Sequence, residues 1–285
     1  MPYFNIVAET SENTVVTEYE PVKKRSDSYQ SEAELEQEFI RLLCEQGYEY
    51  LPIHTEKDLI ANLRKKLEEL NNYQFSDTEW DDFFKNAVAN PNEHIVEKTR
   101  KIQEDNVQVL TRDDGSSKNI TLIDKKNIHN NRLQVINQYK VNAAPGSREG
   151  SLGCVIGTEN GAKHDNRYDV TVLVNGLPLV HIELKRRGVA IREAFNQINR
   201  YQSDSFWAGC GLYEYIQIFV ISNGTNTKYY SNSTRRNAEK EHEKRGASKT
   251  KTSNSFEFTC FWADANNRVI PDLIDFTKTF FAKHT

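Results

Sequence analysis

The sequence predicts a mixed α/β domain, in which a β-sheet is flanked by helices and an acidic helical region lies toward the amino terminus. Apolar residues recur at helical spacing through the first third of the chain. From about Val107 they cluster instead in short runs rich in Val, Ile, Tyr and Phe, bounded by Gly, Asn and Pro. Residues 190–202 return to helical spacing between two such runs, which indicates a strand, helix, strand unit.

The amino-terminal third is expected to be helical after a short extension. Residues 1–30 read as an extension with a possible strand at 14–17, and Ser31 with Glu34 forms a capping box that starts the first helix, which Gly47 ends. Further helices are predicted at 59–70, 76–88 and 94–101, within an acidic helical region, 56–105.

The charge distribution separates this region from the rest. Residues 1–105 carry 23 acidic and 12 basic residues, whereas the whole chain has a net charge of −4, so the remainder is positively charged. A positive excess suits a polyanionic partner such as nucleic acid.

The remaining chain is predicted to form a sheet. The predicted strands are 133–141, 168–174, 179–185, 215–222 and 256–262. Residues 231–255 contain seven Lys or Arg, three Glu and no large apolar residue, which predicts a flexible basic loop. We expect one domain over residues 31–275, and 276–285 to begin a connection to further domains.

The composition argues against several classes of protein. The four cysteines, Cys44, Cys154, Cys210 and Cys260, are far apart and form no CxxC pair, so we expect core thiols rather than disulfides or structural zinc. The longest apolar run is only a few residues, and the amino end lacks the pattern of a secretory signal. We therefore expect no membrane span and a cytoplasmic protein.

The residues that carry chemistry gather around a predicted hairpin. Because side chains alternate along a strand, Glu183 and Lys185 share one face. Asp169 lies in the preceding strand, and Asn175-Gly176 between them is a hairpin signal. A two-residue turn would send Asp169 and Glu183 to opposite faces. We therefore predict either a three-residue loop, 175–177, or a one-residue bulge, which would place them side by side.

Two carboxylates this close would repel each other unless a divalent cation lay between them. Oxygen ligands select hard ions, so we expect Mg²⁺ or Mn²⁺, held by Asp169, Glu183 and the backbone carbonyl of Leu184. Lys185 would orient the attacking water or balance charge in the transition state. His181 shares the same face, and we expect it to be structural. The predicted reaction is hydrolysis of phosphodiester bonds.

Asp169, Glu183, Leu184 and Lys185 resemble the PD-(D/E)xK nuclease motif, with Tyr168 where the motif's name has Pro. The stretch QINRY, 197–201, resembles the QxxxY element of RecB-like nucleases and restriction subunits. The blocks SEAELEQEFIRLLCEQGYEYL, NRLQVINQY and ISNGTNTKYY lie in the matching order around them. Together they resemble the nuclease domain at the amino terminus of the restriction (R, HsdR) subunit of type I restriction-modification enzymes, over residues 30–275.

The resemblance implies a restriction-endonuclease-like fold and a Mg²⁺-dependent type I site-specific deoxyribonuclease. Such an endonuclease would cleave unmodified double-stranded DNA in a bacterial or archaeal cytoplasm, together with modification (M) and specificity (S) subunits. The full-length subunit would also be an ATP-dependent DNA translocase. No GxxxxGK[ST] phosphate loop occurs in these 285 residues, so ATP is expected to act only through motor domains absent from this chain.

The surroundings of the motif suggest supporting residues. Gln197 and Tyr201 are one helical turn apart and are expected to reach the metal face or a DNA phosphate. Phosphate contacts without base readout are expected from Arg167, Arg186, Arg187, Arg192 and Arg200. Two alternatives stay open: a stand-alone RecB-like repair nuclease, and a catalytically silent nuclease fold used for DNA binding or docking.

Overall fold

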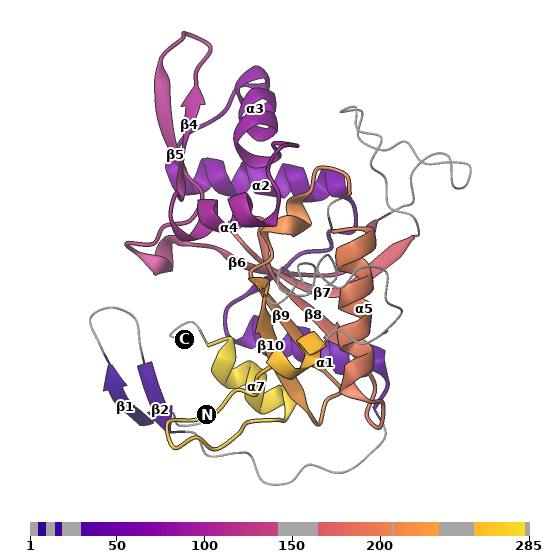
Figure 1. Ribbon diagram of the computed structural model, residues 1–285. Helices are drawn as coiled ribbons and strands as arrows, with labels where there is room; N and C mark the ends of the chain where they lie inside the picture. The colour runs from indigo at the N-terminus through magenta and orange to yellow at the C-terminus, as the bar shows by residue number, and fades with distance from the viewer. Residues whose placement is uncertain are drawn as a thin grey trace. The chain divides into compact units, whose positions relative to one another are not determined.

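The computed structural model describes residues 5–9, 15–18, 30–141, 165–206, 208–233 and 254–282 (Figure 1). The strands are β1 (Asn5–Glu9), β2 (Val15–Glu18), β3 (Glu49–Tyr50), β4 (Val107–Thr111), β5 (Ser117–Thr121), β6 (Leu133–Val141), β7 (Asn166–Val174), β8 (Leu177–Leu184), β9 (Ile218–Ser222) and β10 (Thr227–Ser231). The helices are α1 (Glu32–Glu45), α2 (Glu56–Asn71), α3 (Asp77–Phe83), α4 (Ile95–Gln103), α5 (Ile191–Asp204) and α7 (Leu273–Phe280). Across these ranges, no helix is long and apolar enough to cross a membrane.

Six strands form one mixed sheet in the order β10-β9-β8-β7-β6-β3. The β3–β6 pair is parallel, whereas β6–β7 and β9–β10 are antiparallel. A mixed sheet accompanied by helices confirms the predicted α/β class. The chain divides into two compact units: unit 1 comprises residues 1–48, 182–198 and 218–285, and unit 2 comprises 49–181 and 199–217.

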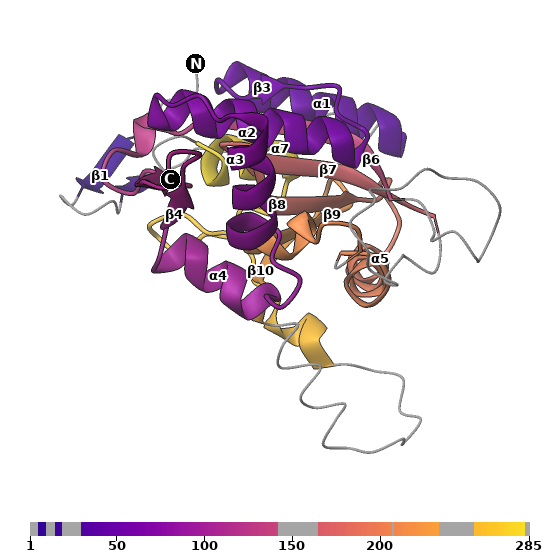
Figure 2. The same ribbon diagram turned by 90° about the horizontal axis from the view of Figure 1, so that it is seen from above.

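Unit 1 is built on two helices that lie side by side, α1 and α7 (Figures 1 and 2). The predicted capping box of α1 is present, because Ser31 and Glu34 each accept from the other's backbone N–H. The ring of Phe39 on α1 packs edge-to-face against Phe281 at 5.7 Å. Phe276 of α7 is fully buried, so this part of the predicted connecting segment, 276–285, contributes to the core of unit 1.

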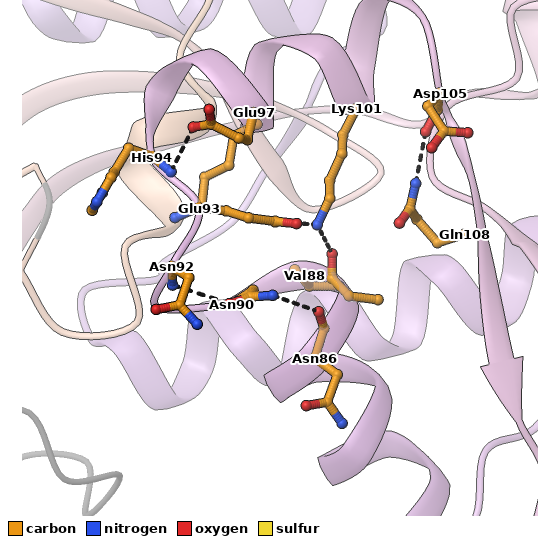
Figure 3. Close-up of polar contacts among 12 residues, drawn as sticks. Asn86, Val88, Asn90, Asn92, Glu93, His94, Glu97, Lys101, Asp105 and Gln108 are labelled. Atoms are coloured by element: carbon orange, nitrogen blue, oxygen red, sulfur yellow. Dashed lines mark hydrogen bonds and ion pairs between the residues drawn. The ribbon is translucent and has the colours of Figure 1, made fainter.

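Unit 2 contains the acidic helical region. The apolar stripe of α2 is buried through Leu59, Leu63 and Leu67, which have 0% exposure, while its charged residues lie around it. The predicted helix 76–88 forms as α3 followed by a π-helical turn, 84–88. Figure 3 shows how the next helix, α4, is tied to this turn: the Lys101 ammonium contacts Glu93 and a backbone carbonyl.

Two regions differ from the sequence-based expectation. The predicted strand 256–262 is wrong: a 3-10 helix, Asn254–Phe258, is followed by a single antiparallel bridge between Cys260 and Tyr229. The apolar residues of this segment serve as separate aromatic contacts rather than as one face of a strand. The two-stranded sheet β4–β5 was not predicted, because its short polar runs carry only Leu110 and Ile120 as buried residues.

The predicted core position is wrong for Cys44 and Cys260, which are exposed, whereas Cys210 is half-buried. All three are free thiols. Cys154 lies outside the described residues, as does most of the predicted basic loop, whose first residue, Ser231, ends β10.

Candidate active site

The carboxyl end of β8, in unit 1, carries the ExK part of the motif. Glu183 is fully buried, and the side chain of Lys185 is 13% exposed. The Lys185 ammonium donates hydrogen bonds of 3.0 Å to Glu183 Oε1 and 3.0 Å to the backbone O of Leu184. The backbone N–H of Lys185 donates to Ser222 O of β9 at 2.8 Å, which holds the strand end in place.

A carboxylate oxygen and a backbone carbonyl oxygen therefore both accept hydrogen bonds from the Lys185 ammonium. A buried carboxylate is strongly destabilised unless a positive charge or hydrogen bonds compensate its lost hydration. A carboxylate and a backbone carbonyl are also ligands that hard ions such as Mg²⁺ accept, so Glu183 and Leu184 fit part of a coordination set. No cluster of three or more His, Cys, Asp or Glu side chains suited to a metal occurs among the described residues. An ion here would thus need backbone, water or substrate oxygens as well.

Asp169 lies in unit 2, on β7, at a point where the strand is irregular. Pairing with β6 continues on either side of it, and Gln138 is the β6 residue that falls opposite Asp169 in this register. Gln138 has a φ of 52°, in the left-handed region that a non-glycine residue rarely adopts inside a strand.

The side chains of β7 confirm the irregularity. Tyr168 and Thr171 are three residues apart, so in a regular strand they would face opposite sides. Both nevertheless reach Tyr213: the Tyr168 ring lies 4.6 Å from its ring, and Thr171 Oγ1 lies 3.3 Å from its hydroxyl. The alternation of β7 is therefore broken between them, where Asp169 lies, although the register with β6 is the same on both sides of it.

The turn between β7 and β8 has two residues, Asn175 and Gly176, with φ values of 51° and 85°. Both left-handed values are typical of a type I′ hairpin turn. A Cβ on Gly176 would also lie 2.6 Å from the Cα of Leu63, so only glycine fits. The predicted three-residue loop, 175–177, is wrong, because β8 already begins at Leu177. The alternative, a one-residue bulge, and the placement of Asp169 beside Glu183 both stay predictions.

His181, in unit 2, is fully buried among aromatic rings. Its ring centroid lies 5.5 Å from that of Tyr168 and 5.5 Å from that of Phe206. Burial lowers the pKa of His181 from 6.5 to about 4, and the negative charge of Asp169 opposes this shift. The imidazole is consequently neutral near pH 7, which agrees with the expected structural role.

Helix α5 carries the QxxxY element. Tyr201 is buried, and its hydroxyl donates a 2.9 Å hydrogen bond to the backbone O of Arg167 in unit 2. This bond attaches the helix to the start of β7, two residues before Asp169. Gln197 is half-buried. That Gln197 and Tyr201 reach the metal face or a DNA phosphate stays a prediction.

The predicted phosphate-binding residues differ in exposure. Arg187 is half-buried, and the others are exposed: Arg167, Arg186, Arg192 and Arg200. Two of them lie over aromatic rings, with the guanidinium carbon of Arg192 at 4.3 Å from the Phe256 centroid and that of Arg200 at 5.6 Å from Tyr201.

Helix α1 carries two acids of interest, of which the sequence analysis missed Glu36. Glu32 Oε1 accepts the backbone N–H of Arg186 at 3.2 Å, so this helix reaches the segment after β8 within unit 1. Glu36, one turn later on the same face, is only 8% exposed. The signal was present in the sequence, because Glu36 falls between Leu35 and Phe39 in the apolar stripe.

The mixed sheet and a strand end that joins a buried Glu to a Lys define a nuclease-type α/β domain. Comparison with known families agrees, since residues 29–238 match the family described as type I restriction enzyme R protein N terminus, and the chain belongs to this family.

Individual relatives point the same way. The chain is 46% identical over 280 residues to the type I restriction enzyme EcoprrI endonuclease subunit of Escherichia coli, which covers 98% of this chain and 79% of that protein. It is 35% identical over 257 residues to the SsaAORF53P endonuclease subunit of Staphylococcus saprophyticus, covering 88% of this chain but 23% of that protein. The predicted family and function class, a type I restriction endonuclease subunit, are thereby confirmed.

Proposed function

We propose that this chain is the DNA-cleaving part of a type I restriction enzyme and hydrolyses phosphodiester bonds of unmodified double-stranded DNA with Mg²⁺ or Mn²⁺. The observation that carries the proposal is the end of β8, where the Lys185 ammonium lies 3.0 Å from both Glu183 Oε1 and Leu184 O. A site that brings two hard oxygen donors and an amine together suits phosphoryl chemistry.

Asp169 is proposed as the second carboxylate ligand. Its strand β7 is the neighbour of β8 in the sheet. The broken alternation of β7 and the charge effect of Asp169 on His181 support a position on the His181 side of the strand. Because His181 and Glu183 are two residues apart on β8, they share that side. The proposed ligands are therefore Asp169, Glu183 and the carbonyl of Leu184.

The residues of this chain would then have distinct roles. A bound divalent ion would polarise the phosphate and lower the pKa of a bound water. Lys185 would hold the attacking water or offset negative charge on the phosphate as it becomes pentacovalent. Tyr201 would keep the start of β7 in place through Arg167. The exposed arginines near the motif would contact DNA phosphates without reading bases.

The enzyme's wider setting is part of the same proposal. M and S subunits would supply modification and recognition, and ATP would be used by motor domains of the R protein outside these 285 residues. The reaction would take place in the cytoplasm, where the DNA substrate lies. The relatives named above are all endonuclease subunits of type I enzymes, which favours this reading over a stand-alone repair nuclease.

Calorimetric titration with Mn²⁺ tests the site directly. Asp169→Asn and Glu183→Gln should each abolish the binding heat, because each removes a charged ligand. Glu193→Gln, at an exposed acid on α5, is the matched control and should bind as the wild type does. Unchanged binding in both ligand variants would overturn the metal site.

Cleavage of unmodified plasmid by the complex reconstituted with M and S subunits and ATP then tests the activity. The wild type should cut and Glu183→Gln should not. A wild-type complex that binds Mn²⁺ and DNA yet leaves the plasmid intact would support the catalytically silent docking module instead.

A further inference from the structure

Unit 1 exposes aromatic rings next to cations at the edge of the sheet. Phe258, which ends the 3-10 helix after β10, is 59% exposed, and Phe261, which follows that helix, is 38% exposed. Lys228 of β10 places its ammonium 5.0 Å from the centroid of Phe256 and 4.7 Å from that of Phe261. The guanidinium carbon of Arg192, on α5, also lies 4.3 Å from the centroid of Phe256. We call these five residues the aromatic–cation patch.

The patch is held by fixed contacts. Tyr229 and Cys260 exchange backbone hydrogen bonds of 2.9 and 2.8 Å, which attach the segment to the edge strand β10. Phe256 packs edge-to-face on Phe195 of α5 at 5.4 Å. Lys228 Nζ also donates to Thr259 Oγ1 at 3.1 Å. The exposed rings of Phe258 and Phe261 therefore project from an ordered base.

The cations of the patch keep their charge available. Within the part of the chain that the structure describes, neither Lys228 nor Arg192 forms an ion pair with a carboxylate. A cation stacked on an aromatic ring still has N–H donors to offer to a phosphate. The exposed Phe rings, in contrast, are in unfavourable contact with water until an apolar or π surface covers them.

We infer that the aromatic–cation patch binds an unpaired DNA strand. Bases of a single strand can stack on Phe258 and Phe261 while its phosphates contact Lys228 and Arg192, which is the combination that single-strand-binding proteins use. Paired duplex DNA hides the faces of its bases, so it would use the cations alone. The inference rests on the proposed function in taking DNA as substrate, and it names the form of DNA that unit 1 holds.

Fluorescence polarisation in EDTA tests this without cleavage, so a failed metal site cannot affect the result. The full chain should bind a labelled oligo-dT strand more tightly than a duplex of equal length. Phe258→Ala combined with Phe261→Ala should weaken single-strand binding by about tenfold or more, and duplex binding by less than about twofold. Val269→Ala, at another exposed apolar residue of unit 1, is the control and should bind normally.

Substitutions at one ring separate stacking from general apolar contact. Phe258→Tyr should keep wild-type affinity for the single strand, because it keeps an aromatic face. Phe258→Leu should bind the single strand more weakly, because it removes that face. Lys228→Gln should make the slope of log affinity against log salt concentration shallower, by the amount expected for the loss of about one phosphate contact. Equal wild-type affinity for duplex and single strand, or wild-type binding by Phe258→Leu, would overturn the inference.

Discussion

Two buried Lys–Glu pairs lie in different parts of this protein. In unit 2, Lys98 of α4 donates to Glu214 Oε2 at 3.0 Å and to Gly211 O at 2.9 Å, with side-chain exposures of 2% and 7% for the pair. In unit 1, Lys185 donates to Glu183 Oε1 at 3.0 Å, with exposures of 13% and 0%. The charges and distances are alike, but the surroundings are not.

The difference lies in what each pair connects. Lys98 and Glu214 are 116 residues apart in sequence, so their contact closes a long loop and holds α4 against the segment 211–215. Glu183 and Lys185 are two residues apart on one strand, and their contact constrains the chain little. Their geometry instead provides oxygens that another cation could share. A buried ion pair is thus structural in one case and, as proposed, chemical in the other.

The largest effect is expected for Lys185→Met in the plasmid-cleavage assay. Loss of the amine should reduce the rate of cleavage at least about a hundredfold, as removal of one transition-state charge partner typically does. Stability should fall in EDTA, because Glu183 is left buried without a cation, and should recover with Mg²⁺. Cleavage within tenfold of the wild type would show that Lys185 is only a partner for Glu183.

Lys98→Met should lower the stability of the protein in a way that Mg²⁺ does not reverse. Removing the amine leaves the Glu214 carboxylate buried without its partner, which typically destabilises a protein by about 3–5 kcal/mol. Urea denaturation at pH 7 should show this loss equally in Mg²⁺ and in EDTA. Arg41→Met, in an exposed pair with Glu45, is the control and should change stability by less than about 1 kcal/mol. A loss that Mg²⁺ reverses would remove the distinction between the two pairs.

Acid should destabilise the protein through His181. Its pKa is about 4 in the folded state and 6.5 when unperturbed, so between these values the unfolded chain binds a proton that the folded chain does not. Stability should therefore fall by about 3 kcal/mol as the pH drops from 6.5 to 4. Denaturation of the wild type and His181→Phe across this range isolates the contribution. Identical pH profiles for both proteins would exclude it.

Tyr201→Phe should have the smallest effect. It removes one hydrogen bond to the backbone of Arg167, worth about 1 kcal/mol, and leaves the ring in place. A positioning role predicts that cleavage falls by less than about tenfold, with unchanged Mn²⁺ affinity measured by calorimetry. Complete loss of cleavage with normal stability would instead assign the hydroxyl to a direct contact with DNA.

Local patterns in the sequence determined most elements and the ExK end of the site. The capping box at Ser31, the apolar stripe of α2 and the Asn175-Gly176 turn act within a few residues, so they can be recognised without knowledge of the fold. The pairing of Glu183 with Lys185 is of the same kind, because alternation along one strand places both on one face.

Only the tertiary structure decided the features that depend on distant partners. The break of β7 at Asp169 is visible through Gln138 on β6 and through Tyr213, neither of which is near it in sequence. The segment 256–262 has apolar residues typical of a strand, yet its aromatic side chains contact α5 and β10 separately, and a 3-10 helix forms instead. Burial and pairing with remote residues outweigh local preference at such positions, and a pattern within a few residues does not contain that information.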